Sequence, residues 1–218
     1  MSAPDLGTVE PIPEKPSRLI FLPGALGRTD VWQPAARLLS YPAQKLHVTW
    51  PGFSGMPSDP TIRKLDDLAT RVLADIDQPT ALIAQSMGGV VAMLAALRKP
   101  ELVTHLVLSV TSGGMRMEDF DAQDWRPEVQ AQNPGLPDWF ISHREDLTPR
   151  LSTLDIPTLL LWGDADPISP VKAGQRLAAV LPRAELHVVP GGGHDVACAF
   201  AGQVAPLIDR HLSGTHGR

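Results

Sequence analysis

Six short apolar runs alternate with helix-length segments along the 218 residues of the chain. Each run has the length of a buried strand and is bounded by residues that favour turns. Alternating strands and helices with short connections favour a mostly parallel, doubly wound sheet flanked by helices on both faces. We therefore expect a single α/β domain spanning residues 1–218. The predicted strands are residues 18–22, 45–50, 80–84, 105–110, 158–162 and 185–189.

The segments between and after these runs carry helical signals. Residues 62–76 place their apolar side chains at a helical period. Residues 87–98 are apolar almost all round, which predicts a helix buried on several sides. Asp30 stands where an N-cap is expected. The predicted helices are residues 30–39, 62–76, 87–98, 171–181 and 196–212.

Two segments depart from the alternation. Residues 1–17 contain four prolines, which predicts an irregular N-terminal lead-in. Residues 113–153 stand where a helix is expected, yet they hold four of the ten Phe and Trp residues of the chain. We interpret this second segment as a small lid insertion over the carboxyl edge of the sheet, because an exposed set of rings would favour aggregation. A surface loop with a solvated charged face is the alternative. We call residues 113–153 the lid segment.

Composition excludes several classes of protein. Hydrophobic residues make up 43% of the chain, enough to form a core. The net charge of −5 disfavours a general nucleic-acid binder, and no apolar run is long enough to span a membrane. Without a secretory signal at the N-terminus, the expected location is cytoplasmic. The lone Cys198 excludes an intrachain disulfide and a cysteine-based zinc site. It follows His194 by four residues, which could place a thiol near a site, but we expect it to be a small buried packing residue on the last helix.

The most informative motif surrounds Ser86. It follows a predicted strand and opens a predicted helix, with Ala84 two residues before it and Gly88 two residues after it. Small residues at these positions allow a sharp turn that exposes a serine hydroxyl at the edge of the sheet. The alternative is an ordinary N-cap serine.

Three further loops follow predicted strands. Residues 22–27 are rich in glycine and could direct a backbone N–H at a developing oxyanion. Asp164 and Asp166 both follow a strand, where a carboxylate could orient an imidazole, and either could instead cap its own turn. His194 follows a run of three glycines after the last strand. No pair of histidines has the helical spacing of a metal site, so we expect no metal.

Taken together, these motifs resemble the α/β-hydrolase superfamily in order and spacing, from residue 18 to residue 212. The resemblance implies a nucleophilic role for Ser86, a general base at His194 and an orienting carboxylate at Asp166. It also implies an oxyanion hole formed by the N–H groups of Ala25 and Met87. The sequence departs from the usual pattern at its Ala84, at Pro23 in place of a common histidine, and at Trp50 in place of a common aspartate. The motifs that carry the resemblance are Leu22-Pro23-Gly24, Ala84-Gln85-Ser86-Met87-Gly88, Gly163-Asp164-Ala165-Asp166 and Gly193-His194.

The expected function is hydrolysis of a small carboxylic ester through an acyl-enzyme, with no cofactor. The lid aromatics favour an apolar small-molecule substrate, and the net charge of −4 between residues 115 and 150 mildly disfavours an anionic one. Two alternatives remain: a lyase or carbon–carbon bond hydrolase on the same scaffold, and a binding protein without turnover. The oligomeric state is not indicated.

Overall fold

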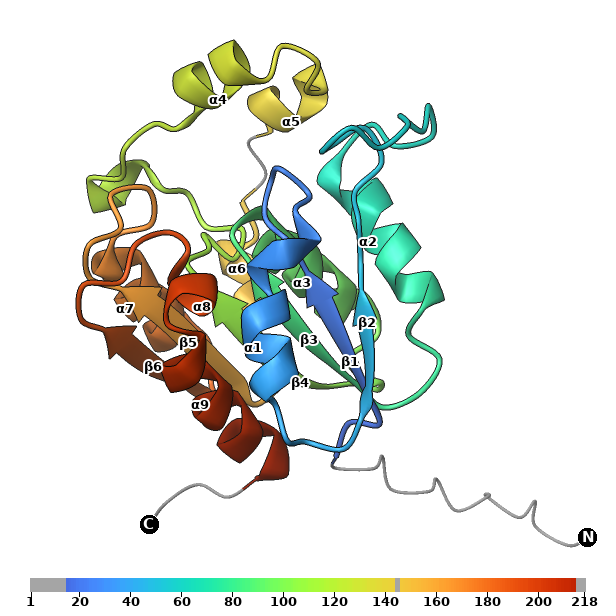
Figure 1. The fold of residues 1–218 in the computed structure, drawn as a ribbon, viewed down its shortest axis with the longest axis vertical. Helices are drawn as coiled ribbons and strands as arrows, with labels where there is room; N and C mark the ends of the chain where they lie inside the picture. The colour runs from blue at the N-terminus through green and yellow to red at the C-terminus, as the bar shows by residue number, and fades with distance from the viewer. Residues whose placement is uncertain (1–14, 144–145, 215–218) are drawn as a thin grey trace, which may run out of the picture.

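The structure is a computed structural model that describes residues 15–143 and 146–214. Six parallel strands form one sheet in the order β2-β1-β3-β4-β5-β6, which confirms the expected fold class (Figure 1). Of the predicted lead-in, residues 1–14 lie outside the described residues. The strands are β1 (Arg18–Leu22), β2 (Gln44–His47), β3 (Thr80–Gln85), β4 (Val103–Ser109), β5 (Thr158–Gly163) and β6 (Ala184–Val189).

Helices cover both faces of the sheet, because alternate residues of each central strand point to opposite sides. Leu19 and Phe21 of β1 pack on the face covered by α1, α8 and α9, whereas Ile20 and Leu22 pack on the face covered by α2 and α3. α7 packs on β5 and β6. The helices outside the lid segment are α1 (Gln33–Leu38), α2 (Leu65–Ala74), α3 (Met87–Arg98), α7 (Val171–Val180), α8 (Val196–Ala199) and α9 (Ala201–Ser213).

Three local expectations are wrong. Asp30 is not an N-cap, because Thr29–Val31 form a 3₁₀ turn, Asp30 pairs with the Arg28 side chain, and Trp32 is the N-cap of α1. The strand predicted to reach residue 50 ends at His47. The predicted helix 196–212 is broken at Phe200, so that α8 and α9 are separate.

The lid segment lies above the carboxyl ends of the strands (Figure 1). It contains the 3₁₀ turn η2 (Glu118–Phe120) and the short helices α4 (Arg126–Gln132), α5 (Asp138–Ser142) and α6 (Thr148–Leu151). Phe140 is 4% exposed, and its ring stacks on Trp125 with centroids 5.0 Å apart. Phe53, from the loop after β2, packs edge-on against the same Phe140 ring at 5.6 Å. An aromatic cluster therefore joins the lid segment to the sheet domain.

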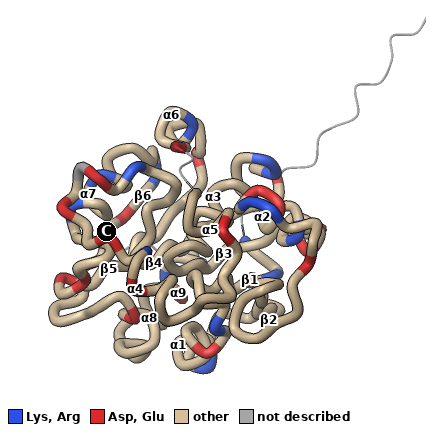
Figure 2. The backbone as a smooth tube through the Cα atoms, turned by 90° about the horizontal axis from the view of Figure 1, so that it is seen from above, with Lys and Arg blue, Asp and Glu red and all other residues tan. Residues whose placement is uncertain are grey.

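Charged positions of both signs are interspersed along the backbone of the described chain (Figure 2). Asp66, Asp67 and Arg71 share the single helix α2, for example. None of the described helices is long and apolar enough to cross a membrane.

Candidate active site

Ser86 lies in a sharp turn between β3 and α3. Its backbone has φ 53° and ψ −121°, a conformation that costs a non-glycine residue roughly 1–3 kcal/mol. Hydrogen bonds on both sides hold it there. The Ser86 N–H donates to the Ser109 carbonyl (2.9 Å), and the Ser86 carbonyl accepts from the Thr111 hydroxyl (2.6 Å) and the Gly89 N–H (2.9 Å).

Close packing behind the turn explains its small residues. A Cβ atom on Gly88 would lie 2.5 Å from the Pro23 carbonyl oxygen and 2.7 Å from that of Leu22. Only glycine therefore lets α3 approach β1 this closely. Ala84 is fully buried in β3, opposite Leu22 in the register, so its methyl group is accommodated where the usual motif has glycine.

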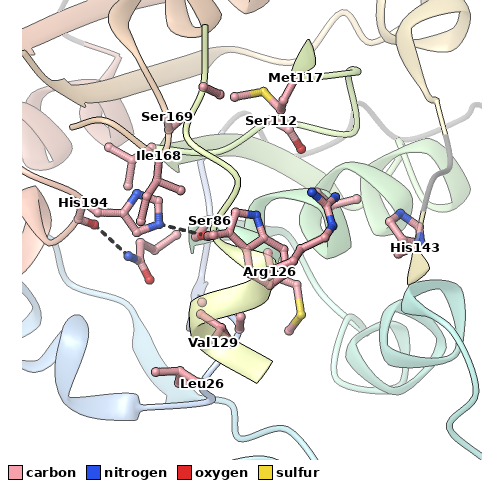
Figure 3. A pocket seen from close by; sticks show the side chains of 18 of the residues that line it. Leu26, Ser86, Ser112, Met117, Arg126, Val129, His143, Ile168, Ser169 and His194 are labelled. Carbon is pink, nitrogen blue, oxygen red and sulfur yellow. Dashed lines mark hydrogen bonds between the residues drawn. The ribbon is translucent and has the colours of Figure 1, made fainter. Parts of the chain in front are cut away.

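His194 connects Ser86 to a buried carboxylate. Its Nε2 lies 3.0 Å from the Ser86 Oγ, and its Nδ1 lies 2.7 Å from the Asp166 Oδ2 (Figure 3). The Asp166 side chain has no exposed surface, whereas the His194 side chain is 26% exposed. Because a carboxylate can only accept, Nδ1 carries the proton and Nε2 accepts from the serine hydroxyl. Ser86 occupies the N-cap position of α3 but makes no side-chain capping bond.

The geometry separates the two candidate aspartates. The second Asp166 oxygen, Oδ1, accepts from the N–H groups of Ile168 (2.8 Å) and Ser169 (3.1 Å), which fixes the carboxylate. Asp164 instead accepts from the Gly191 N–H at 2.6 Å and holds the glycine loop. Only Asp166 reaches the imidazole.

The glycines in and beside the loop before His194 meet two different backbone requirements. Gly191 has φ 73°, a conformation that favours glycine. A Cβ on Gly163 would lie 2.1 Å from the Gly192 carbonyl oxygen, so the end of β5 and this loop touch through their backbones. This contact brings the loop across the sheet edge toward Ser86.

Gln85 is a residue that sequence reasoning missed. It is 8% exposed, and its Nε2 donates to the His194 carbonyl oxygen at 2.9 Å. A Cβ on Gly24 would lie 2.6 Å from the Gln85 Oε1, so the same side chain also lies against the loop after β1. The signal that could have indicated its role is a polar residue at the end of a buried strand, directly before the serine.

Two tryptophans support the loop after β1. The Trp50 Nε1 lies 3.1 Å from both the Pro23 and the Gly24 carbonyl oxygens, and the Trp32 Nε1 donates to the Leu22 carbonyl at 3.1 Å. Trp50 and Pro23 are both departures from the usual motif. The first therefore supports the loop that contains the second.

Two backbone amides beside Ser86 have no acceptor among the described residues. They are the N–H groups of Ala25, in the loop after β1, and Met87, the first residue of α3. Both residues line the same cavity as Ser86. The first amides of a helix also lie at the positive end of its dipole. N–H groups in these positions can donate hydrogen bonds to an oxyanion that forms beside Ser86.

A cavity of about 1060 Å³ lies between Ser86 and the lid segment. Cys198 lines it and is half-buried on α8, so the expectation of a buried packing residue is wrong.

Near the loop after β1, Arg28 and Asp30 form an ion pair at 2.6 Å. This contact raises the pKa of Arg28 and lowers the pKa of Asp30, so both stay charged at neutral pH. Apolar cavity residues include Leu65, Met87, Val90, Val110, Trp125 and Phe140.

Sequence comparison relates the chain to a known family. Residues 19–151 match the alpha/beta hydrolase family, and residues 144–197 match the alpha/beta hydrolase fold. The chain belongs to the alpha/beta hydrolase family.

Among curated proteins, this alpha/beta hydrolase is similar to the pimeloyl-[acyl-carrier protein] methyl ester esterase of Edwardsiella ictaluri, with 25% identity over 81% of this chain and 85% of that protein. It is also 28% identical to the uncharacterized hydrolase YugF of Bacillus subtilis, over 62% of this chain. The chain spans 66% of the length of YugF and 25% of a chloroperoxidase relative from Synechocystis.

Solved structures share the fold. An esterase from Exiguobacterium antarcticum superposes with a TM-score of 0.78 at 15% identity, over 91% of this chain and 92% of that one. Within the described residues of this alpha/beta hydrolase, no three His, Cys, Asp or Glu side chains gather as a metal site.

Proposed function

We propose that the protein is a serine hydrolase that cleaves small carboxylic esters through an acyl-enzyme. The observation that carries this proposal is the hydrogen-bonded chain from the Ser86 Oγ through His194 to Asp166, with spacings of 3.0 and 2.7 Å. Support for ester cleavage comes from the methyl ester esterase relative, which aligns with most of the chain.

In the proposed acylation, His194 Nε2 removes the Ser86 hydroxyl proton as the oxygen attacks the ester carbonyl. The Ala25 and Met87 N–H groups donate to the oxyanion that forms, and Asp166 stabilises the imidazolium. His194 then protonates the departing alcohol. In deacylation, the same imidazole removes a proton from the water that attacks the acyl carbonyl. The Ser86 oxygen then leaves and takes this proton from the imidazolium, and the carboxylic acid is released. Each proton taken is returned, so no cofactor is required.

The cavity supports a mainly apolar ester. Leu65, Val90 and Phe140 line it together with the Trp125 ring, so an aliphatic or aromatic group of the substrate would displace water from apolar walls. The Ser86 side chain lines the same cavity, as do those of Val129 and Ile168 (Figure 3).

The test compares wild type with Ser86→Ala on p-nitrophenyl butyrate. Loss of the nucleophile lowers kcat by about 10⁶-fold in sites of this kind, and we expect a loss of that order. A fluorophosphonate probe should label the wild type at Ser86 and leave the variant unlabelled. Thermal unfolding checks that the variant is folded. Unchanged turnover by Ser86→Ala, or an unlabelled wild type without esterase activity, would refute the proposal.

A further inference from the structure

Arg126 brings a cation into the cavity above Ser86. It is the first residue of α4 in the lid segment, and its side chain lines the cavity with that of Ser86 (Figure 3). The guanidinium carbon lies 4.9 Å from the centroid of the Trp125 ring, which itself stacks on the buried Phe140. This cation–π contact with a packed ring favours the observed position of the guanidinium.

The guanidinium has an unused hydrogen-bonding edge. Its Nη1 donates to the Asp124 Oδ1 at 3.1 Å, while its Nε is buried and has no acceptor in the part of the chain that the structure describes. Nε and Nη2 share the edge that fits the two oxygens of a carboxylate. A buried charged donor without an acceptor is costly, so a ligand oxygen that satisfies it gains affinity.

Two of the acids that line the cavity near Arg126 are paired with arginines, which weakens their repulsion of an anion, whereas Asp146 lines the cavity without such an ion pair among the described residues. Asp124 is paired with Arg126, and Glu118 lies 3.8 Å from Arg116, so these four charges cancel. The pKa of Glu118 is lowered, first by its own backbone N–H and then by Arg116 and Arg126, so Glu118 is ionised at neutral pH. Beside Arg126, the four paired charges therefore balance, and one donor edge of the guanidinium is left unsatisfied by the described part of the chain.

We propose that Arg126 binds a carboxylate at the far end of the acyl chain, so that the substrates are half-esters of dicarboxylic acids. This inference rests on the proposed function. The apolar spacer between the two ends would lie on the walls formed by Leu65, Val90 and Phe140. We assign the carboxylate to the acyl part because this part stays in the site through both acylation and deacylation, so one anchor serves both steps.

The experiment measures kcat/KM for monomethyl esters of four- to eight-carbon dicarboxylic acids against methyl esters of the matching monocarboxylic acids. We expect the best half-ester to exceed its neutral match by about tenfold or more, as a charge-assisted bidentate contact allows. In Arg126→Gln the ratio should fall to about one, mainly through KM. Arg126→Lys should recover only part of it, because lysine supplies charge without the fork.

The matched control is Arg150→Gln, an exposed arginine at the end of α6 in the same lid segment. It should keep the wild-type ratio. Two further substrates test the assignment: amides of the half-esters, and acetyl esters of ω-hydroxy acids, which carry the carboxylate on the alcohol side. The inference is overturned if the wild-type kcat/KM for half-esters exceeds neither that for their neutral matches nor that for these two substrates.

The two proposals fail in different ways. If the wild type hydrolyses neutral esters and reacts with the fluorophosphonate at Ser86 but shows no half-ester preference, only the Arg126 subsite is wrong. If it does neither and also leaves every half-ester intact, the proposed hydrolase function is wrong.

Discussion

Replacing Asp166 by Asn tests the proposed roles at a single atom. In the wild type, Oδ1 accepts from two backbone N–H groups and Oδ2 accepts from His194 Nδ1. The side-chain carbonyl of the introduced asparagine would keep the two backbone bonds, because abandoning both costs roughly 1–3 kcal/mol for each buried donor left unsatisfied. The amide NH₂ would then face Nδ1, which has to become an acceptor.

This exchange moves the imidazole proton to Nε2, so the ring cannot take the Ser86 proton. In Ser-His-Asp sites such an inversion lowers kcat by about 10⁴-fold, which is roughly 5 kcal/mol in the barrier. Asp164→Asn is the matched control. Asp164 holds only the Gly191 N–H, and an Asn carbonyl can accept the same bond. We expect that variant to lose less than about tenfold.

The assay is the initial rate on p-nitrophenyl butyrate at pH 8, with thermal unfolding to verify that both variants are folded. The reasoning is refuted if Asp166→Asn stays within tenfold of the wild type. It is equally refuted if Asp164→Asn is the more damaging substitution.

Two further predictions concern positioning and stability. Gln85→Met keeps a side chain of similar volume but removes the donor to the His194 carbonyl. We therefore expect kcat for p-nitrophenyl butyrate to fall about tenfold with KM nearly unchanged. A proportional rise in KM would contradict this positioning role. The His47 ring stacks on Phe21 with centroids 4.6 Å apart. Its pKa is lowered from the ordinary value of 6.5, mainly by burial and then by the nearby Lys45 charge. The unfolded chain therefore binds more protons, so His47 contributes its full stability above pH 6.5 and loses it as the pH falls through the lowered value. Urea unfolding between pH 7.5 and 5 should show a shallower decline for His47→Gln than for wild type, and equal declines would exclude the effect.

Local pattern was sufficient for the elements that are buried and regular. The strand Arg18–Leu22 and the helix Met87–Arg98 have the predicted bounds. Their apolar residues are buried in the core, and residues that favour turns stand at the ends of both elements. Element ends were less predictable. The strand predicted to reach Trp50 stops at His47, and the Trp50 indole instead contacts the Pro23 and Gly24 carbonyls. These contacts join residues far apart in the chain, so no local sequence pattern predicts them.

The sequence alone determined the parallel α/β class, the serine turn and the shortlist of acidic and imidazole groups, because each depends on residue type and short-range spacing. Tertiary structure decided which members of that shortlist meet. Asp164 and Asp166 are two residues apart and chemically identical, yet only Asp166 faces His194, since the turn amides and the glycine loop orient each carboxylate differently. The Gln85 contact and the unsatisfied edge of Arg126 likewise exist only once distant strands and the lid segment are packed together.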